Sequence, residues 1–317
     1  MPSFRHSGHR LSYRVYEPAT PAARRSGPPA SKRPLILVHG LLLSQRMHMP
    51  LARDLAARGN RVITIDLLGH GSSERPRDMW RYSMEAFGEQ VVGVMDHLEL
   101  EQAVVGGTSL GANTTLEVAA RAPDRLRGMV IEMPVLDNAL LACAVAFSPL
   151  LVALTFGEPV MRQVSRLTRA IPPRLLPFYA DVVLDTLRQD PAPSAAVLQG
   201  LFFGRVAPPR SERRKFSAPA LVIGHRRDPV HPFSDAGMLV EELRDGHLLE
   251  ADSLIELRLS PERLTGEIAA FLDQCWGTRA GGVRRGERAS KRASARSETR
   301  AASPGRRSAR TDRAAGG

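Results

Sequence analysis

A single serine lies between glycines in the stretch Gly107-Thr108-Ser109-Leu110-Gly111. An apolar run precedes it and a helix-forming run follows it, so the serine is predicted to lie on a tight turn between a strand and a helix. Glycines two residues before and two after would let the strand and the helix approach closely around a strained serine backbone. The next amide would then point to where an oxyanion forms. The chemistry indicated is attack of a serine hydroxyl on a carbonyl group, although the same spacing also occurs in ordinary turns.

Three further groups of polar residues follow short apolar runs that are typical of buried strands. They are His39-Gly40 after Pro34–Val38, Asp66–Ser73 at the end of Arg61–Leu67, and His225–Pro232 after Ala220–Gly224. Ligands of a parallel sheet bind at the carboxyl ends of its strands. We therefore expect these groups and Ser109 to lie near one another.

Strand-like and helix-like patterns alternate along most of the chain, which predicts an α/β fold with a mostly parallel central sheet and helices on both faces. The alternation stops between residues 134 and 217, where apolar helical patterns are broken by many prolines. We interpret 134–217 as an inserted helical cap. Residues 1–133 and 218–276 are then predicted to form the core.

The order of these motifs resembles that of the α/β-hydrolase family, in its cap-bearing esterase and epoxide-hydrolase-like branch. The resemblance covers roughly Arg10–Trp276 apart from the cap. It implies that Ser109 is the nucleophile and that Asp228 is the acid. It also implies that the backbone amides of Leu41 and Leu110 form an oxyanion hole. The reaction expected is acyl transfer, in which a histidine takes the serine proton.

The chain departs from the family pattern at that histidine. The expected position is occupied by Leu254, seven residues before Pro261. His231 is the best substitute, because its loop should border the site and it keeps the order serine, acid, histidine. His70 and His39 come next, although structural roles in their own loops are expected for both. His247 should lie at the far end of its strand, and Glu132 is either an alternative acid or a strand-end charge.

The segment Ala139–Phe156 has no charged residue over eighteen positions. A membrane span is conceivable at this length, but Pro149 lies within it and strands of one sheet flank the insertion. We expect instead that the cap lines an apolar pocket for a small apolar substrate or ligand. Weak contact with a membrane surface stays open.

Composition separates the C-terminal residues 277–317 from the rest. They hold twelve of the 44 Lys and Arg residues and three of the 33 acidic residues, so most of the net charge of +11 belongs to them. Few large apolar residues occur there, which predicts a disordered basic tail. No aromatic residues interleave with the charges, so no specific nucleic-acid binding is expected.

Two distant cysteines and a polar N-terminus favour a reducing compartment, and we expect a cytoplasmic protein. The sequence predicts a serine-nucleophile hydrolase of an ester, lactone or similar small apolar acyl compound. No cofactor and no metal are expected. The alternative is a catalytically impaired protein of the same fold that binds an apolar ligand. The oligomeric state does not follow from the sequence.

Overall fold

The computed structural model describes residues 1–18 and 33–277 of the 317-residue chain. Residues 19–32 and the predicted tail apart from Gly277 lie outside the described residues. Eight strands form one sheet in the order β1-β2-β4-β3-β5-β6-β7-β8. The strands are β1 (Ser3–His6), β2 (His9–Tyr16), β3 (Pro34–Val38), β4 (Arg61–Asp66), β5 (Ala103–Thr108), β6 (Leu126–Glu132), β7 (Ala220–His225) and β8 (Gly246–Ala251).

Pairing from β4 through β3, β5, β6 and β7 to β8 is parallel, which confirms the prediction of a mostly parallel sheet. The antiparallel strands β1 and β2 extend it at one edge. Strand β1 was missed by the sequence analysis, because it is four residues long and buries only Phe4. A two-residue turn, Ser7-Gly8, joins it to β2 with positive φ at both residues, the geometry that suits a tight hairpin.

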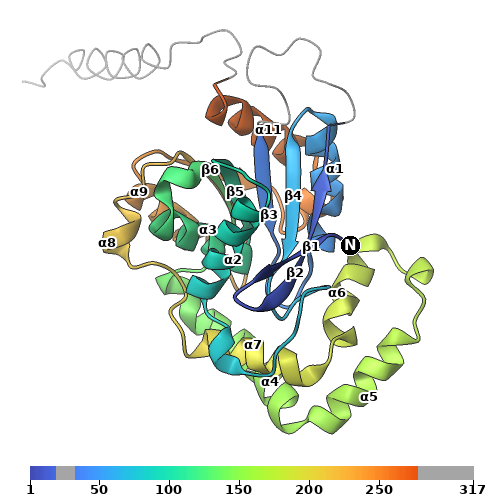
Figure 1. Cartoon of the computed structure of the whole chain (residues 1–317). Coiled ribbons are helices and arrows are strands. Elements are labelled where there is room, and N and C mark those ends of the chain that lie inside the picture. The colour runs from blue at the N-terminus through green and yellow to red at the C-terminus, as the bar shows by residue number, and fades with distance from the viewer. Residues whose placement is uncertain (19–32, 278–317) are drawn as a thin grey trace, which may run out of the picture. The chain divides into compact units, whose positions relative to one another are not determined.

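Helices cover both faces of the sheet because the central strands carry apolar side chains on both sides. In β3, Leu35 and Leu37 pack toward one core and Ile36 and Val38 toward the other. The first core includes residues of α1 (Met49–Ala57), α10 (Glu256–Leu259) and α11 (Glu262–Cys275). The second core includes residues of α2 (Met84–His97), α3 (Leu110–Arg121) and α9 (Phe233–Glu242). In Figure 1 these three helices lie to the left of β3 and β4, and α1 lies to the right of these strands.

Only helices lie between β6 and β7, in the region predicted as the cap. They are α4 (Leu140–Phe156), α5 (Glu158–Arg169), α6 (Phe178–Arg188), α7 (Pro191–Phe202) and α8 (Arg210–Arg213), with short 3₁₀ turns between some of them. Helices α4 and α7 pack together, and so do α5 and α6. Because β6 and β7 are neighbours in the sheet, this insertion leaves the core and returns to it at adjacent strand ends. In Figure 1, α4, α5 and α7 lie below the strands.

Candidate active site

Ser109 lies on the turn between β5 and α3 with φ 55° and ψ −109°, a conformation that is strained for a residue with a side chain. Its amide donates to the carbonyl of Glu132 on the neighbouring strand, at 2.9 Å. A Cβ atom on Gly107 or Gly111 would lie 2.4 or 2.1 Å from the carbonyl oxygen of Val38. Both glycines are therefore required by the close approach of β3, β5 and α3.

The structure brings Ser109, His231 and Asp228 into one hydrogen-bonded chain. The Nε2 atom of His231 lies 2.9 Å from Ser109 Oγ, and its Nδ1 atom lies 2.8 Å from Asp228 Oδ2. Asp228 and His231 both come from the loop between β7 and α9. A base that accepts the serine proton at Nε2 must carry its own proton on Nδ1, and a carboxylate at Nδ1 favours that tautomer.

Asp228 is fixed by its own loop. Its Oδ1 atom accepts hydrogen bonds from the amides of Val230 and His231, at 2.8 and 2.9 Å. Burial would raise the pKa of Asp228, but the hydrogen bonds from the side chain and backbone of His231 outweigh it and lower the pKa. The carboxyl group is thus ionised at neutral pH and can orient the His231 ring.

The backbone amides of Leu41 and Leu110 belong to residues that line the same cavity as Ser109. Leu110 begins α3, so its amide has no acceptor within the helix. The amide of Leu41 shares a planar peptide with the carbonyl of Gly40, so the two point in opposite directions. His39 Nδ1 donates to that carbonyl at 2.8 Å and thereby fixes the direction of the Leu41 amide.

His39 and His70 are buried, and their hydrogen bonds fix the loops that follow β3 and β4. The Nε2 atom of His39 accepts from the amide of Leu67 at 3.1 Å, and Nδ1 of His70 lies 2.9 Å from the carbonyl of Leu68. Burial lowers the pKa of both rings, so each is neutral. These contacts fit the structural roles expected for both. Leu254 lies partly exposed in the segment between β8 and α10, and His247 is in the first half of β8.

Glu132 belongs to a buried network beneath Ser109. Its carboxylate accepts hydrogen bonds from Thr108 Oγ1 and from Arg258 Nη2, the latter at 2.6 Å, and His225 Nε2 lies 3.7 Å away. Burial would raise the pKa of Glu132, yet Arg258 and these hydrogen bonds hold the pKa well below its usual range. Burial has the opposite effect on a histidine and would lower the pKa of His225, but the contact with Glu132 raises this pKa. Sequence reasoning missed Arg258, because no motif marks it.

We expect Arg258→Met to destabilise the protein by about 3 kcal/mol, since it leaves the Glu132 carboxylate buried without a cation. The double variant Arg258→Met/Glu132→Gln should regain most of the loss. Urea unfolding followed by circular dichroism would measure both. A matched control is Arg226→Met, which removes an exposed pair with Glu250 and should cost little. Equal stability of Arg258→Met and wild type would show that Glu132 is held by other groups.

The cavity beside Ser109 has a volume of about 290 Å³ and is lined mostly by apolar side chains. The residues of α4 and α7 that line it are Leu140, Cys143, Ala144, Phe147, Leu198, Leu201 and Phe202. The Asn113 amide also borders it but is bonded to the backbone of Val135 and Val206. Burial raises the pKa of the Cys143 thiol to about 11, so this thiol stays protonated at neutral pH and is a poor nucleophile.

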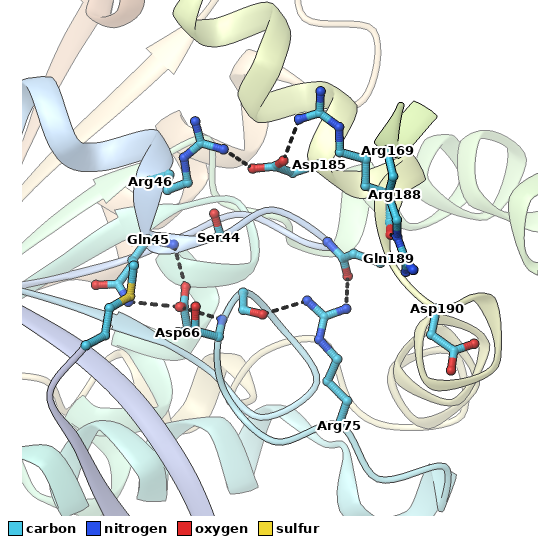
Figure 2. Close-up of a pocket in the computed structure, with 13 residues that line it drawn as sticks. Ser44, Gln45, Arg46, Asp66, Arg75, Arg169, Asp185, Arg188, Gln189 and Asp190 are labelled. Atoms are coloured by element: carbon cyan, nitrogen blue, oxygen red, sulfur yellow. Dashed lines mark hydrogen bonds and ion pairs between the residues drawn. The ribbon is translucent and has the colours of Figure 1, made fainter. Parts of the chain in front are cut away.

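A second cavity of about 400 Å³ is lined mostly by residues with polar or charged side chains (Figure 2). Asp66 accepts hydrogen bonds there from the backbone and side chain of Gln45 and from the amide of Ser72. Arg75 bonds to Gln189, and Arg46 and Arg188 both pair with Asp185 and with Asp181. These contacts tie the loops after β3 and β4 to α6, and they explain why the Asp66–Ser73 motif is polar.

Several known proteins are similar to this chain. It is 39% identical over 104 residues to 2-hydroxymuconate semialdehyde hydrolase of Pseudomonas sp. (strain CF600), a match that covers 31% of this chain and 35% of that protein. The chain thus matches about a third of the length of such curated relatives.

Solved structures match over a longer span. The enol-lactonase of Burkholderia xenovorans LB400 superimposes with a TM-score of 0.65 and 24% identity, over 86% of this chain and 99% of that one. A thermophilic esterase of Thermogutta terrifontis gives 0.64 and 19% identity, over 86% and 97%. At identities of 24 and 19%, these similarities show that this chain has the same fold as the two enzymes. The family model of the alpha/beta hydrolase fold matches residues 33–237, most of the described residues, and the chain therefore belongs to this family.

Proposed function

We propose that the protein is a serine hydrolase that acts on an ester, lactone or similar small apolar acyl compound. The observation that carries the proposal is the hydrogen-bonded chain from Asp228 through His231 to Ser109, with distances of 2.8 and 2.9 Å. The names of the similar proteins, which include a hydrolase, a lactonase and an esterase, support the same reaction class.

In this mechanism, His231 Nε2 takes the proton of Ser109 as its oxygen attacks the carbonyl carbon. The oxyanion of the tetrahedral intermediate accepts hydrogen bonds from the amides of Leu41 and Leu110. The intermediate collapses to an acyl-serine, and His231 gives the proton to the leaving alcohol. A water activated by His231 then hydrolyses the acyl-serine and restores Ser109, while ionised Asp228 orients the ring throughout.

The apolar lining supports an apolar acyl group, because the other polar side chains at the cavity already have partners. Asn113 is bonded to two backbone segments, and Arg205 is paired with Glu85 and Glu117. The alternative, ligand binding without turnover, was suggested by the leucine at position 254. His231 at hydrogen-bonding distance from Ser109 favours turnover over this alternative.

Acyl-chain length tests the assignment of the cavity. Each added methylene should raise kcat/KM by roughly fourfold while the chain still fits, so p-nitrophenyl butyrate, with two more methylenes, should exceed the acetate by about fifteenfold. Ala144→Phe fills the cavity and should abolish that gain while leaving acetate hydrolysis nearly unchanged. Ala146→Phe, exposed on the same helix, is the matched control. Identical chain-length profiles for the two variants would contradict this site for the acyl group.

A further inference from the structure

The turn Gly40–Leu43, which carries the Leu41 amide, contains a strained residue. The Leu43 amide donates to the Gly40 carbonyl at 3.1 Å and closes the turn. Leu42 occupies its third position with φ 57°, where a type II turn favours glycine or asparagine. A branched side chain in this left-handed region persists only where the surrounding structure holds it. The contacts of Leu42 therefore help to set the shape of the proposed oxyanion hole.

Two side chains of the cap hold the Leu42 carbonyl. Gln189 Nε2 donates to it at 2.7 Å, and Thr186 Oγ1 donates to it at 3.2 Å. Thr186 lies in the last turn of α6, and Gln189 directly follows this helix. Since His39 of the core fixes the first carbonyl of the turn, core and cap hold the turn between them.

Arg75 determines which way the Gln189 side-chain amide faces. Its Nη1 atom donates to Gln189 Oε1 at 3.0 Å, and its Nη2 atom donates to the carbonyl of Gly71 at 2.8 Å (Figure 2). A guanidinium group only donates, so the amide oxygen must face Arg75 and the NH₂ group must face Leu42. Gln189 is 8% exposed, so water has little access to replace a lost hydrogen bond at this position.

Ion pairs hold α6 against the core beside these contacts. Arg46, three residues after the turn, pairs with Asp181 at 2.7 Å and also with Asp185. Arg188 pairs with the same two carboxylates, and both belong to α6. The side chain of Asp181 is 3% exposed, so these pairs are poorly screened by solvent. The helix is therefore fixed to the segment that it supports.

We propose that Gln189 is a positioning residue for the oxyanion hole, because its hold on the Leu42 carbonyl keeps the Leu41 amide aimed at the oxyanion. The catalytic consequence rests on the proposed function, whereas the support of the turn does not. Without the Gln189 donor, rotation of the peptide between Leu41 and Leu42 would relieve the positive φ and shift the turn. The oxyanion hole would then be complete only while α6 is seated on the core.

Gln189→Met tests the catalytic consequence, because methionine keeps the length of the side chain and cannot donate. We expect kcat/KM for p-nitrophenyl acetate to fall about thirtyfold, less than the roughly 10²- to 10³-fold loss of a whole oxyanion donor. The loss is partial because His39 still holds the Gly40 carbonyl. KM should change by less than about twofold, since acylation and deacylation use the same oxyanion hole.

The hydroxyl of Thr186 allows a conservative comparison at the same carbonyl. Thr186→Val should lower kcat/KM by about threefold, because one neutral hydrogen bond is lost. Thr186→Ser, which keeps the hydroxyl, should restore most of that loss. The short acyl group of p-nitrophenyl acetate uses little of the apolar cavity, so these effects are separated from substrate binding. Rates would be expressed per serine titrated with the fluorophosphonate probe.

Hydrogen exchange tests the support of the turn without any turnover. In full-length Ser109→Ala protein, a peptide covering residues 40–46 should exchange at least about tenfold faster when Gln189→Met is added, because the hydrogen bond of the Leu43 amide opens more often. Exchange in β5 and α3 should be unchanged, which would exclude a loss of global stability.

The matched control is Gln102→Met. The Gln102 amide also donates to a backbone carbonyl, that of Asp124 at 2.8 Å, at the end of β5 remote from Ser109. Its kinetics and exchange should equal those of the parent. The inference is overturned if Gln189→Met leaves exchange of residues 40–46 unchanged, or if exchange rises while kcat/KM stays at the wild-type value.

Wild-type protein without Ser109-dependent turnover would refute the proposed function instead. The catalytic consequence would fall with it, and the exchange measurement would still decide whether the cap holds the turn. A loss of kcat/KM in Gln189→Met that disappears when rates are expressed per titrated serine would also contradict the positioning role, because it would show only a loss of folded protein.

Discussion

Ser109→Ala should lower kcat/KM for p-nitrophenyl butyrate by about 10⁴- to 10⁶-fold, because the oxygen that would form the acyl-enzyme is removed. The residual rate should come from the oxyanion hole and substrate binding alone. The fold should be unaffected, since the Ser109 backbone conformation is set by the glycines around it. Initial rates on purified protein and a melting curve would measure both effects.

A fluorophosphonate probe reports an activated serine independently of the substrate. Wild type should be labelled at Ser109, and Ser109→Ala should not be labelled. Ser234→Ala, which removes an exposed hydroxyl at the start of α9, is the matched control and should keep full activity and labelling. Absence of labelling and of Ser109-dependent turnover across a broad ester panel would refute the enzyme assignment. Tight binding of an apolar ligand without product would then support the alternative.

His231→Ala should cost nearly as much as the loss of the serine, because a serine hydroxyl is a weak nucleophile without a base. The double variant Ser109→Ala/His231→Ala should be no slower than either single variant, since the two side chains act as one unit. Asp228→Asn should lower kcat by about 10⁴-fold, because the amide no longer favours the tautomer with a proton on Nδ1.

His247→Ala is the control for the loss of a histidine, as this side chain is exposed in β8. It should have wild-type kinetics. If His231→Ala retained most activity while Ser109→Ala lost it, another base would serve Ser109. Loss of probe labelling in His231→Ala would show that the serine itself has lost its activation, which separates this role from an effect on substrate binding.

Much of the fold could be predicted because periodicity and strand-end motifs are local signals. The apolar run Pro34–Val38 coincides with β3, and Ala220–Gly224 covers all of β7 except its last residue. The glycine spacing around Ser109 predicted a strained turn. Strand β1 escaped prediction because its stability comes from pairing with β2 rather than from its own composition.

The site was predictable only in part, because its pieces come together through the sheet. Ser109 and Asp228 were proposed from motif order, and His231 from its place in the same loop as Asp228. The structure puts these three side chains in contact, and their catalytic roles stay predictions until the variants are measured. The buried network of Glu132 and Arg258 joins residues 126 positions apart, a pairing that no local pattern indicates.

Asp228 and His231 lie three residues apart, so one short loop positions both the proposed acid and the proposed base. Their relative positions are set within a single loop, because Asp228 accepts hydrogen bonds from the amides of Val230 and His231. Local opening of that loop would withdraw both groups from the serine at once while the sheet stays intact. Thermal inactivation would then precede global melting, and residual activity would report the stability of this loop rather than that of the fold.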